Sequence, residues 1–167
     1  WVQFNERPWM KAAEITDATL RALKSGDYDF LRLNYANGDM VGHTGDFNAS
    51  VIAAETVDLC LARLLPAVRA AGGVALITAD HGNLDQMYEL APDGSIKTDK
   101  ATGAPQNKTS HTLNPVPFII YDPVPAGPYR LRRLPDPPGL ANVASTILYF
   151  LGYEPPDDYL PSLVEPA

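Results

Sequence analysis

The stretch VALITADHGN, residues 74–83, decides the fold. Residues 74–78 form an apolar run that follows two glycines, which is the pattern of a strand buried on both faces. Such strands are typical of a central parallel sheet. Asp80 and His81 follow the run directly, at the carboxyl end of the strand, where open α/β sheets present their functional groups.

Apolar periodicity predicts further helices and strands on both sides of this run. Apolar residues at helical spacing predict three helices, at residues 9–24, 46–71 and 140–151. Short aromatic and aliphatic runs predict two more strands, at residues 28–33 and 117–121. Because strands alternate with helices, we expect an α/β fold with a mostly parallel central sheet flanked by helices.

Capping residues and prolines set the limits of these elements. Asp46 or Asn48 can cap the long helix, whereas Pro66 lacks an amide hydrogen, so we expect a kink or a break there. The polar residues 90–108 predict an exposed loop or a small hairpin. The proline-dense residues 123–138 predict an irregular surface connection.

The chain reads as two parts of unequal size. Residues 1–153 carry the predicted helices and strands, and residues 154–167 form a tail, rich in proline and acid, that we expect to be loosely ordered. The sequence opens at Trp1, without methionine and at the approach to a helix. We therefore expect it to begin partway through a longer protein.

Composition argues against several classes of function. The 167 residues are 46% hydrophobic, enough to bury a core, and the formal net charge is -7 with thinly spread basic residues. This balance argues against nucleic acid and anionic membranes as partners. The only cysteine, Cys60, excludes an intrachain disulfide and favours a reducing, cytoplasmic setting. No apolar run approaches the roughly 20 residues of a transmembrane helix.

The three histidines are the candidates for chemistry. Asp39 and His43 are four residues apart, so one helical turn can aim both at one ion. The consecutive Asp80 and His81 diverge, so this pair either serves one ion with help from elsewhere or bridges toward two. His111 precedes the strand at 117–121 and should arrive at the same edge of the sheet.

Simpler interpretations exist for each residue alone. A lone histidine is more often a surface or hydrogen-bonded residue than a ligand, and an aspartate four residues before a histidine is weak evidence by itself. The joint placement of all three histidines beside strand ends, two of them with a near aspartate, favours a metal site. Cys60 is better explained as a core residue. The sequence has no glycine-rich phosphate loop of the known nucleotide-binding types.

Three motifs together closely resemble the cofactor-independent phosphoglycerate mutases, members of the alkaline phosphatase superfamily. They are NYANGDMVGHTG at residues 34–45, TADHGN at 78–83, and SHT at 110–112 followed by PVP at 115–117. The resemblance runs in order from about Met10 to Asp122. It implies an alkaline-phosphatase-like fold that is incomplete here, with residues 1–153 as the C-terminal portion of the metal-binding phosphatase-type domain.

The resemblance also implies a site and a reaction. Asp39, His43 and His111 would bind one divalent ion, and Asp80 and His81 a second; the ions are usually manganese in that family. A serine takes the phosphate of 3-phosphoglycerate and returns it to the other hydroxyl, giving 2-phosphoglycerate. The reaction is an isomerisation of glycolysis and gluconeogenesis.

The chain departs from the family pattern in two ways. The family's nucleophilic serine, an aspartate of the second ion and the substrate-binding arginines lie in segments that none of these residues match. We therefore assign no catalytic nucleophile to Ser25, Ser50, Ser95, Ser110, Ser145 or Ser162. The stretch 90–108 is longer than in many bacterial relatives, which affects the local path to His111 but not His111 itself.

Three hypotheses about function follow. The first is the metal-binding part of a phosphoglycerate mutase, inactive by itself and acting in the longer protein on a small phosphoglycerate substrate. The second is a metal-dependent phosphatase or phosphodiesterase of the same superfamily, and the third is a metal-binding module without catalysis. Two carboxylates and three imidazoles suit manganese or zinc, and because zinc binds such ligands more tightly, an incomplete site could hold zinc or stand empty. A sheet with missing neighbours would also favour self-association.

Overall fold

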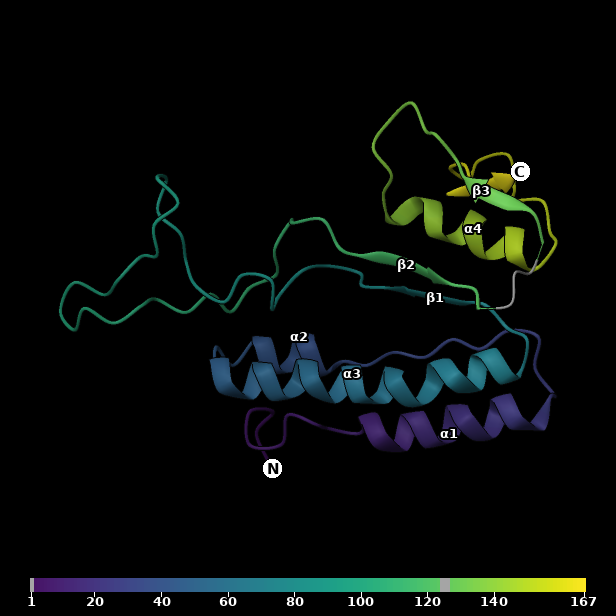
Figure 1. Ribbon diagram of the computed structural model, residues 1–167. Helices are drawn as coiled ribbons and strands as arrows, with labels where there is room; N and C mark the ends of the chain where they lie inside the picture. Colours follow the sequence, from purple (N-terminus) through teal and green to yellow (C-terminus); the bar gives the residue numbers. More distant parts are fainter. Residues whose placement is uncertain (1, 124–126) are drawn as a thin grey trace.

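The computed structural model describes residues 2–123 and 127–167. Its first half is helical: α1 (Ala12–Ser25), the short α2 (Asn37–Gly42) and α3 (Phe47–Ala70) lie together as one layer. Figure 1 shows the ribbon of β1 (Ala75–Thr78) and β2 (Phe118–Tyr121) above this layer. The site residues lie where these parts meet.

A third unit follows β2 in the chain. It contains β3 (Tyr129–Leu131), a 3-10 turn η1 (Leu140–Asn142), α4 (Val143–Phe150) and β4 (Val164–Pro166). Figure 1 shows this unit on the opposite side of the β1–β2 ribbon from the three N-terminal helices. The molecule is therefore a mixed α/β structure, as the sequence predicted.

The strand pairing differs from the predicted mostly parallel sheet. β1 pairs antiparallel with β2, from Ala75 opposite Tyr121 to Thr78 opposite Phe118, and β3 pairs antiparallel with β4. Among the described residues these are two separate two-stranded sheets. β1 is also only partly buried, not buried on both faces, and no described strand covers its second edge.

The predicted helices are confirmed with small changes of boundary. Gly26 ends α1 in the left-handed conformation, which glycine adopts without strain. Asp46 caps α3 by accepting a hydrogen bond from the Ala49 amide at 3.0 Å. We predicted a kink or a break at Pro66, and the break is wrong because α3 continues through it. The carbonyl of the exposed Ala62, which loses its helical partner, can bond water.

The predicted strand at residues 28–33 is not formed. The segment runs without regular structure, and Tyr28 and Phe30 are at least half exposed. A strand requires a neighbour that satisfies its amide and carbonyl groups, and none of the described strands lies in register with this segment. The prediction of a strand at residues 28–33 is therefore wrong for the described structure.

Residues 90–108 belong to an exposed arm with two small hairpins, where the sequence predicted an exposed loop or one small hairpin. Bridges join Tyr88 to Asn107 at the base, Leu90 to Ile96 in one small hairpin and Thr98 to Pro105 in a second, and the arm extends away from the body of the molecule (Figure 1). The base is held by the stacked rings of Phe47 and Tyr88 and by the Asn107 side chain, whose amide donates to the Gly45 carbonyl at 2.9 Å. The arm is exposed while its base is fixed.

The proline-rich segments carry more structure than the sequence indicated. The predicted irregular connection at 123–138 contains β3, although residues 124–126 lie outside the described residues. In the tail, 154–167, Val164 of β4 is fully buried, and the Leu163 amide donates to Thr146 Oγ1 at 2.9 Å. This end of the chain is therefore attached to α4. None of the described helices is long and apolar enough to cross a membrane.

The small core beneath the site consists of Val41 from α2 and Ala49 and Ala53 from α3. Val41 is fully buried, and it stands between Asp39 and His43 in the sequence. Because α2 is short, its position depends on this contact more than on its own helical hydrogen bonds. Packing of Val41 therefore sets where the two polar side chains point.

Val41→Ala should reduce the free energy of unfolding by about 1.5–3 kcal/mol, because it removes two buried carbon atoms and leaves a cavity. Val51→Ala on the same helical layer is the matched control, since Val51 is 41% exposed and its loss should cost less than about 0.5 kcal/mol. Urea unfolding of both variants measures the difference. Equal losses would contradict the assignment of Val41 to the core.

Candidate metal centre

Helix α2 supplies the first two polar groups of the site. Asp39 lies in its first turn and His43 at its C-terminal end, four residues later and therefore on the same face. The helix is fixed in place by Asn37, which is buried and donates to the Pro8 carbonyl at 2.8 Å. A short helix with this anchor presents both side chains in one direction.

His111 comes from a distant part of the sequence. Thr112 pairs with Gly82 in an isolated antiparallel bridge, in which the Thr112 amide donates to the Gly82 carbonyl at 2.9 Å. The chain enters β2 from this side, at the end where it leaves β1. His111 therefore lies beside the loop that carries Asp80 and His81.

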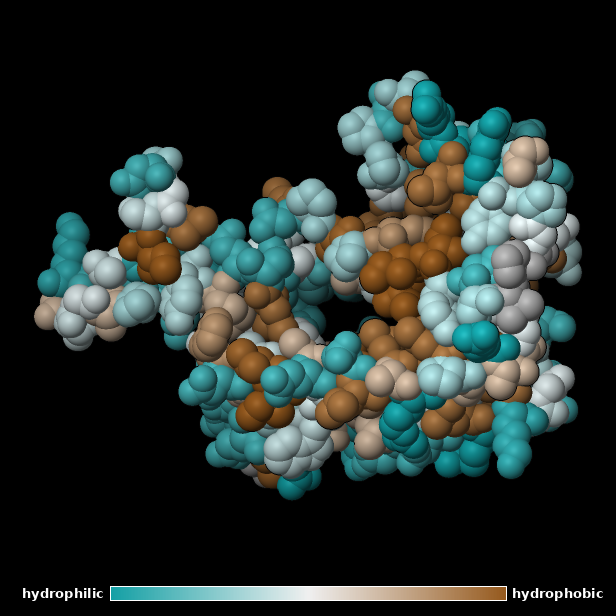
Figure 2. Space-filling view, viewed as in Figure 1, coloured by the Kyte–Doolittle hydropathy of each residue, from teal (hydrophilic) through white to brown (hydrophobic). Residues whose placement is uncertain are grey.

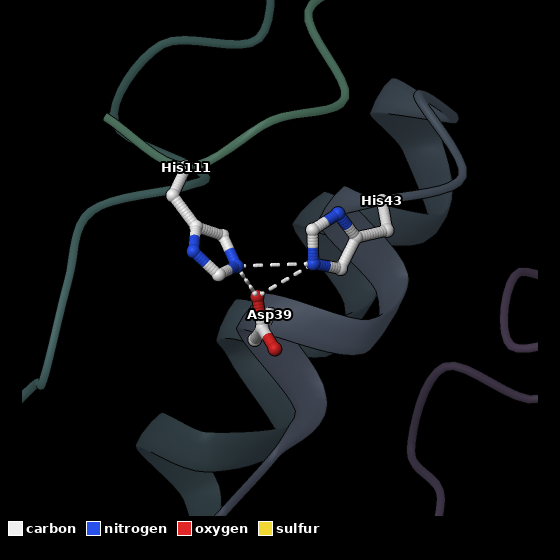
Figure 3. Close-up of side chains that lie close together, drawn as sticks. All are labelled: Asp39, His43 and His111. Atoms are coloured by element: carbon white, nitrogen blue, oxygen red, sulfur yellow. Dashed lines mark hydrogen bonds and ion pairs between the residues drawn. The ribbon is translucent and has the colours of Figure 1, made fainter.

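Three side-chain atoms converge at one point (Figure 3). His111 Nε2 lies 2.9 Å from Asp39 Oδ1, and His43 Nε2 lies 3.1 Å from the same oxygen. The two Nε2 atoms are 3.1 Å apart. The three residues form a group that could hold a metal ion.

The residues fit a divalent cation. Ligands bound at about 2.0–2.2 Å around a tetrahedral ion lie roughly 3.3–3.5 Å from one another, close to the spacing of these three atoms. His43 Nδ1 lies 2.7 Å from the Thr109 carbonyl, which can only accept, so Nδ1 carries the proton. In the neutral ring the lone pair is then on Nε2, the atom that faces Asp39 and His111.

Asp80 and His81 lie at the side of this group. The His81 ring stacks on the His111 ring with centroids 3.5 Å apart, and its Nε2 is 3.8 Å from Asp39 Oδ1. The Asp80 side chain is 90% exposed and lies 3.6 Å from His81 Nε2. The structure thus gathers Asp39, His43 and His111, and leaves Asp80 and His81 as an open pair; that all five are ligands remains a prediction.

The environment of Asp39 favours its charged form. Partial burial raises the pKa of Asp39, but the hydrogen bond from Asn83 and the charges of the three histidines lower it by more, so the net pKa lies below its ordinary value. The site therefore keeps a carboxylate among imidazoles. This is a donor set suited to manganese or zinc.

Sequence reasoning missed one participant. Asn83 is buried, and its Nδ2 donates to Asp39 Oδ1 at 3.0 Å. An asparagine two residues after a histidine has no spacing that predicts such a contact. The only available signal was its place in the stretch that follows β1.

Comparisons with known proteins show the family of the chain. The model of the Metalloenzyme superfamily matches residues 2–155. A 2,3-bisphosphoglycerate-independent phosphoglycerate mutase of Trypanosoma brucei brucei is 50% identical over 99% of this chain and 30% of its own length. A probable enzyme of the same name from Leptospira interrogans is 49% identical over 98% of this chain and 29% of its own length.

A solved structure of a phosphoglycerate mutase is also similar to this chain. The structure of Leishmania mexicana phosphoglycerate mutase at low cobalt concentration is 46% identical, with a TM-score of 0.92, over 99% of this chain and 30% of that one. The resemblance predicted from the motifs is confirmed. The chain spans about 30% of the length of the relatives that it matches.

Asp39→Asn should destabilise the metal-free protein above about pH 4 and progressively less at lower pH. Because the pKa of Asp39 is lowered in the fold, its carboxylate contributes stability above the unfolded value of about 3.9, and this contribution is lost as the pH falls through the lowered value. Urea midpoints of the two proteins in chelator, from about pH 6 to pH 2.5, measure the effect. A difference that did not change with pH would contradict it.

Proposed function

Because the chain belongs to the metalloenzyme superfamily, we propose that it is the metal-binding part of a phosphoglycerate mutase. The reaction is the interconversion of 3-phosphoglycerate and 2-phosphoglycerate through a phosphoserine intermediate. The observation that carries the proposal is the convergence of Asp39, His43 and His111 on one point. Relatives with that name, matched along nearly the whole chain, support the choice of reaction.

The proposed ligands divide into two groups. Asp39, His43 and His111 hold one divalent ion, and their spacing supports this because no large movement is needed to bring the three atoms to ligand distance. Asp80 and His81 serve the second ion, whose remaining ligands come from outside these residues. The exposed position of Asp80 is consistent with a site that is completed from elsewhere. Manganese is the proposed metal for both.

Bound divalent ions supply Lewis acidity, which activates a hydroxyl nucleophile and neutralises charge on a transferred phosphoryl group. The residues of this chain fix the positions of the ligand atoms and keep the imidazoles in the correct tautomer. The Thr109 carbonyl fixes the tautomer of His43 because it accepts a hydrogen bond from His43 Nδ1.

The nucleophilic serine is proposed to lie outside the 167 residues. Three of the serines are buried and hydrogen-bonded to backbone groups. They are Ser50, Ser145 and Ser162. We therefore expect no mutase turnover from this polypeptide alone.

We infer that β1 belongs to a mostly parallel central sheet, of the alkaline phosphatase type, whose other strands come from outside this chain. Two observations support this: the second edge of β1 lacks a strand in the described part, and the exposed aromatic segment 28–33 has the composition of a strand. Residues 1–153 would then be the C-terminal portion of that domain.

The uncovered apolar surface leads us to expect that copies of the isolated chain associate with one another. Figure 2 shows apolar residues on both sides of the open space between the α4 unit and the N-terminal helices. Surfaces of this kind associate unless another segment covers them, so self-association is expected. A cytoplasmic location is proposed from the free, buried Cys60.

Titration of MnCl2 into the 167-residue chain tests the metal part of the proposal. The chain should bind Mn²⁺, and His43→Ala or His111→Ala should weaken binding by about 100-fold or more, because each removes a ligand that the other two cannot replace. Asp93→Asn, in the exposed hairpin, is the control and should leave binding unchanged. Calorimetry measures each affinity.

Two outcomes would count against the proposal. Binding that survived the loss of His43 and of His111 would show that the ion sits elsewhere. Conversion of 3-phosphoglycerate by this polypeptide alone, measured in a coupled assay, would contradict the placement of the nucleophile outside it.

A further inference from the structure

The turn at residues 82–85 contacts both of the other segments that build the site. On one side it reaches helix α2, which carries Asp39, and on the other it reaches the strand entry at 111–114, which carries His111. It also follows His81 directly. One four-residue turn therefore touches every part of the proposed metal centre.

The contact with α2 is made by Asn83. Its Nδ2 donates to Asp39 Oδ1 at 3.0 Å and to the Asp39 carbonyl at 3.2 Å, so it fixes both the side chain and the backbone of that residue. Asn83 is only 6% exposed. It fits because residue 42 is glycine: a Cβ there would stand 2.2 Å from Asn83 Oδ1.

The contact with the His111 segment is made by Asp85. Its carboxylate accepts a hydrogen bond from Thr112 Oγ1 at 2.9 Å and another from Asn114 Nδ2 at 2.5 Å. These bonds lower the pKa of Asp85 by more than burial raises it, so the group stays charged. Gly82 permits the approach, since a Cβ at that position would lie 2.1 Å from Thr112 Oγ1.

Asp85 is better explained as a positioning residue than as a ligand. Donors from Thr112 and Asn114 occupy its carboxylate, and it is not part of the group whose atoms converge around Asp39. Thr112 is adjacent to His111, so the bond to Asp85 fixes the backbone from which the imidazole extends. Asn83 acts in the same way on Asp39.

We propose that the turn 82–85 is a clip that holds Asp39 and His111 at ligand distance before a metal binds. The proposal rests on the proposed function, because it assumes that these residues are ligands. Preorganised ligands lose little conformational freedom on binding, so loosening the clip lowers metal affinity without removing any ligand. Outer groups of this kind typically change metal affinity by about 10–100-fold.

The deciding pair of variants is Thr112→Val and Thr112→Ser. Valine has the shape of threonine but cannot donate to Asp85, whereas serine keeps the hydroxyl. We expect Thr112→Val to weaken Co²⁺ binding by about tenfold or more, and Thr112→Ser to bind close to wild type. Titration of CoCl2 into the full chain, followed by calorimetry and visible absorption, measures both affinity and coordination.

Thr102→Val is the matched control. Thr102 Oγ1 donates to Asp99 Oδ1 at 2.9 Å, the same kind of bond as in the clip, but in the exposed hairpin. Its loss should leave Co²⁺ affinity unchanged. The visible band of bound Co²⁺ at saturation should change in Thr112→Val but not in Thr102→Val, because a released His111 segment alters the ligand geometry.

A second variant keeps the test decisive if Thr112→Val does not fold. Asn114→Ala removes the other donor to Asp85 at an exposed position, and it should weaken Co²⁺ binding in the same direction. Far-ultraviolet circular dichroism of the metal-free proteins verifies folding. Unchanged affinity and an unchanged band in every folded variant of the clip would overturn the proposal.

The result also separates the clip from the proposed function. If wild type does not bind Co²⁺, or if its binding survives His43→Ala, the metal centre itself is wrong. If wild type binds Co²⁺ through His43 while Thr112→Val behaves like Thr112→Ser, only the clip is wrong.

Discussion

The antiparallel pairing of β1 with β2 is the constraint on which the site depends. In such a pair the chain leaves one strand at the end where it enters the other, and here Thr78 lies opposite Phe118. Residues that follow β1 therefore meet residues that precede β2, which brings His81 to His111. A parallel pairing would have put the residues before β2 at the opposite end of the strands.

Asp39 Oδ1 is the point at which the electrostatics of the site are concentrated. Within 3.8 Å of this single oxygen lie the Nε2 atoms of all three histidines, and the Asn83 amide is 3.0 Å away. Two imidazole nitrogens and one carboxylate oxygen within 3.1 Å of one another surround a point that a bound cation could occupy.

Local features of the sequence predicted the structure well, and long-range pairing was predicted poorly. The cap at Asp46, the glycine at the end of α1 and the grouping of Asp39 with His43 all follow from neighbours within a few residues. Strand direction could not be derived in this way, because apolar runs fit either orientation. Asp85 was not predicted for a related reason: its role exists only through Thr112, 27 residues away.

The exposed arm between Tyr88 and Asn107 can change in length without changing the geometry of the site. Both of its ends are fixed at the base, by the Phe47 ring and by the Gly45 carbonyl. Each doubling of such a loop costs only about 0.6 kcal/mol in closure entropy. Evolution can therefore lengthen or shorten the exposed arm while His111 keeps its place, so insertions here say little about whether two relatives share a chemistry.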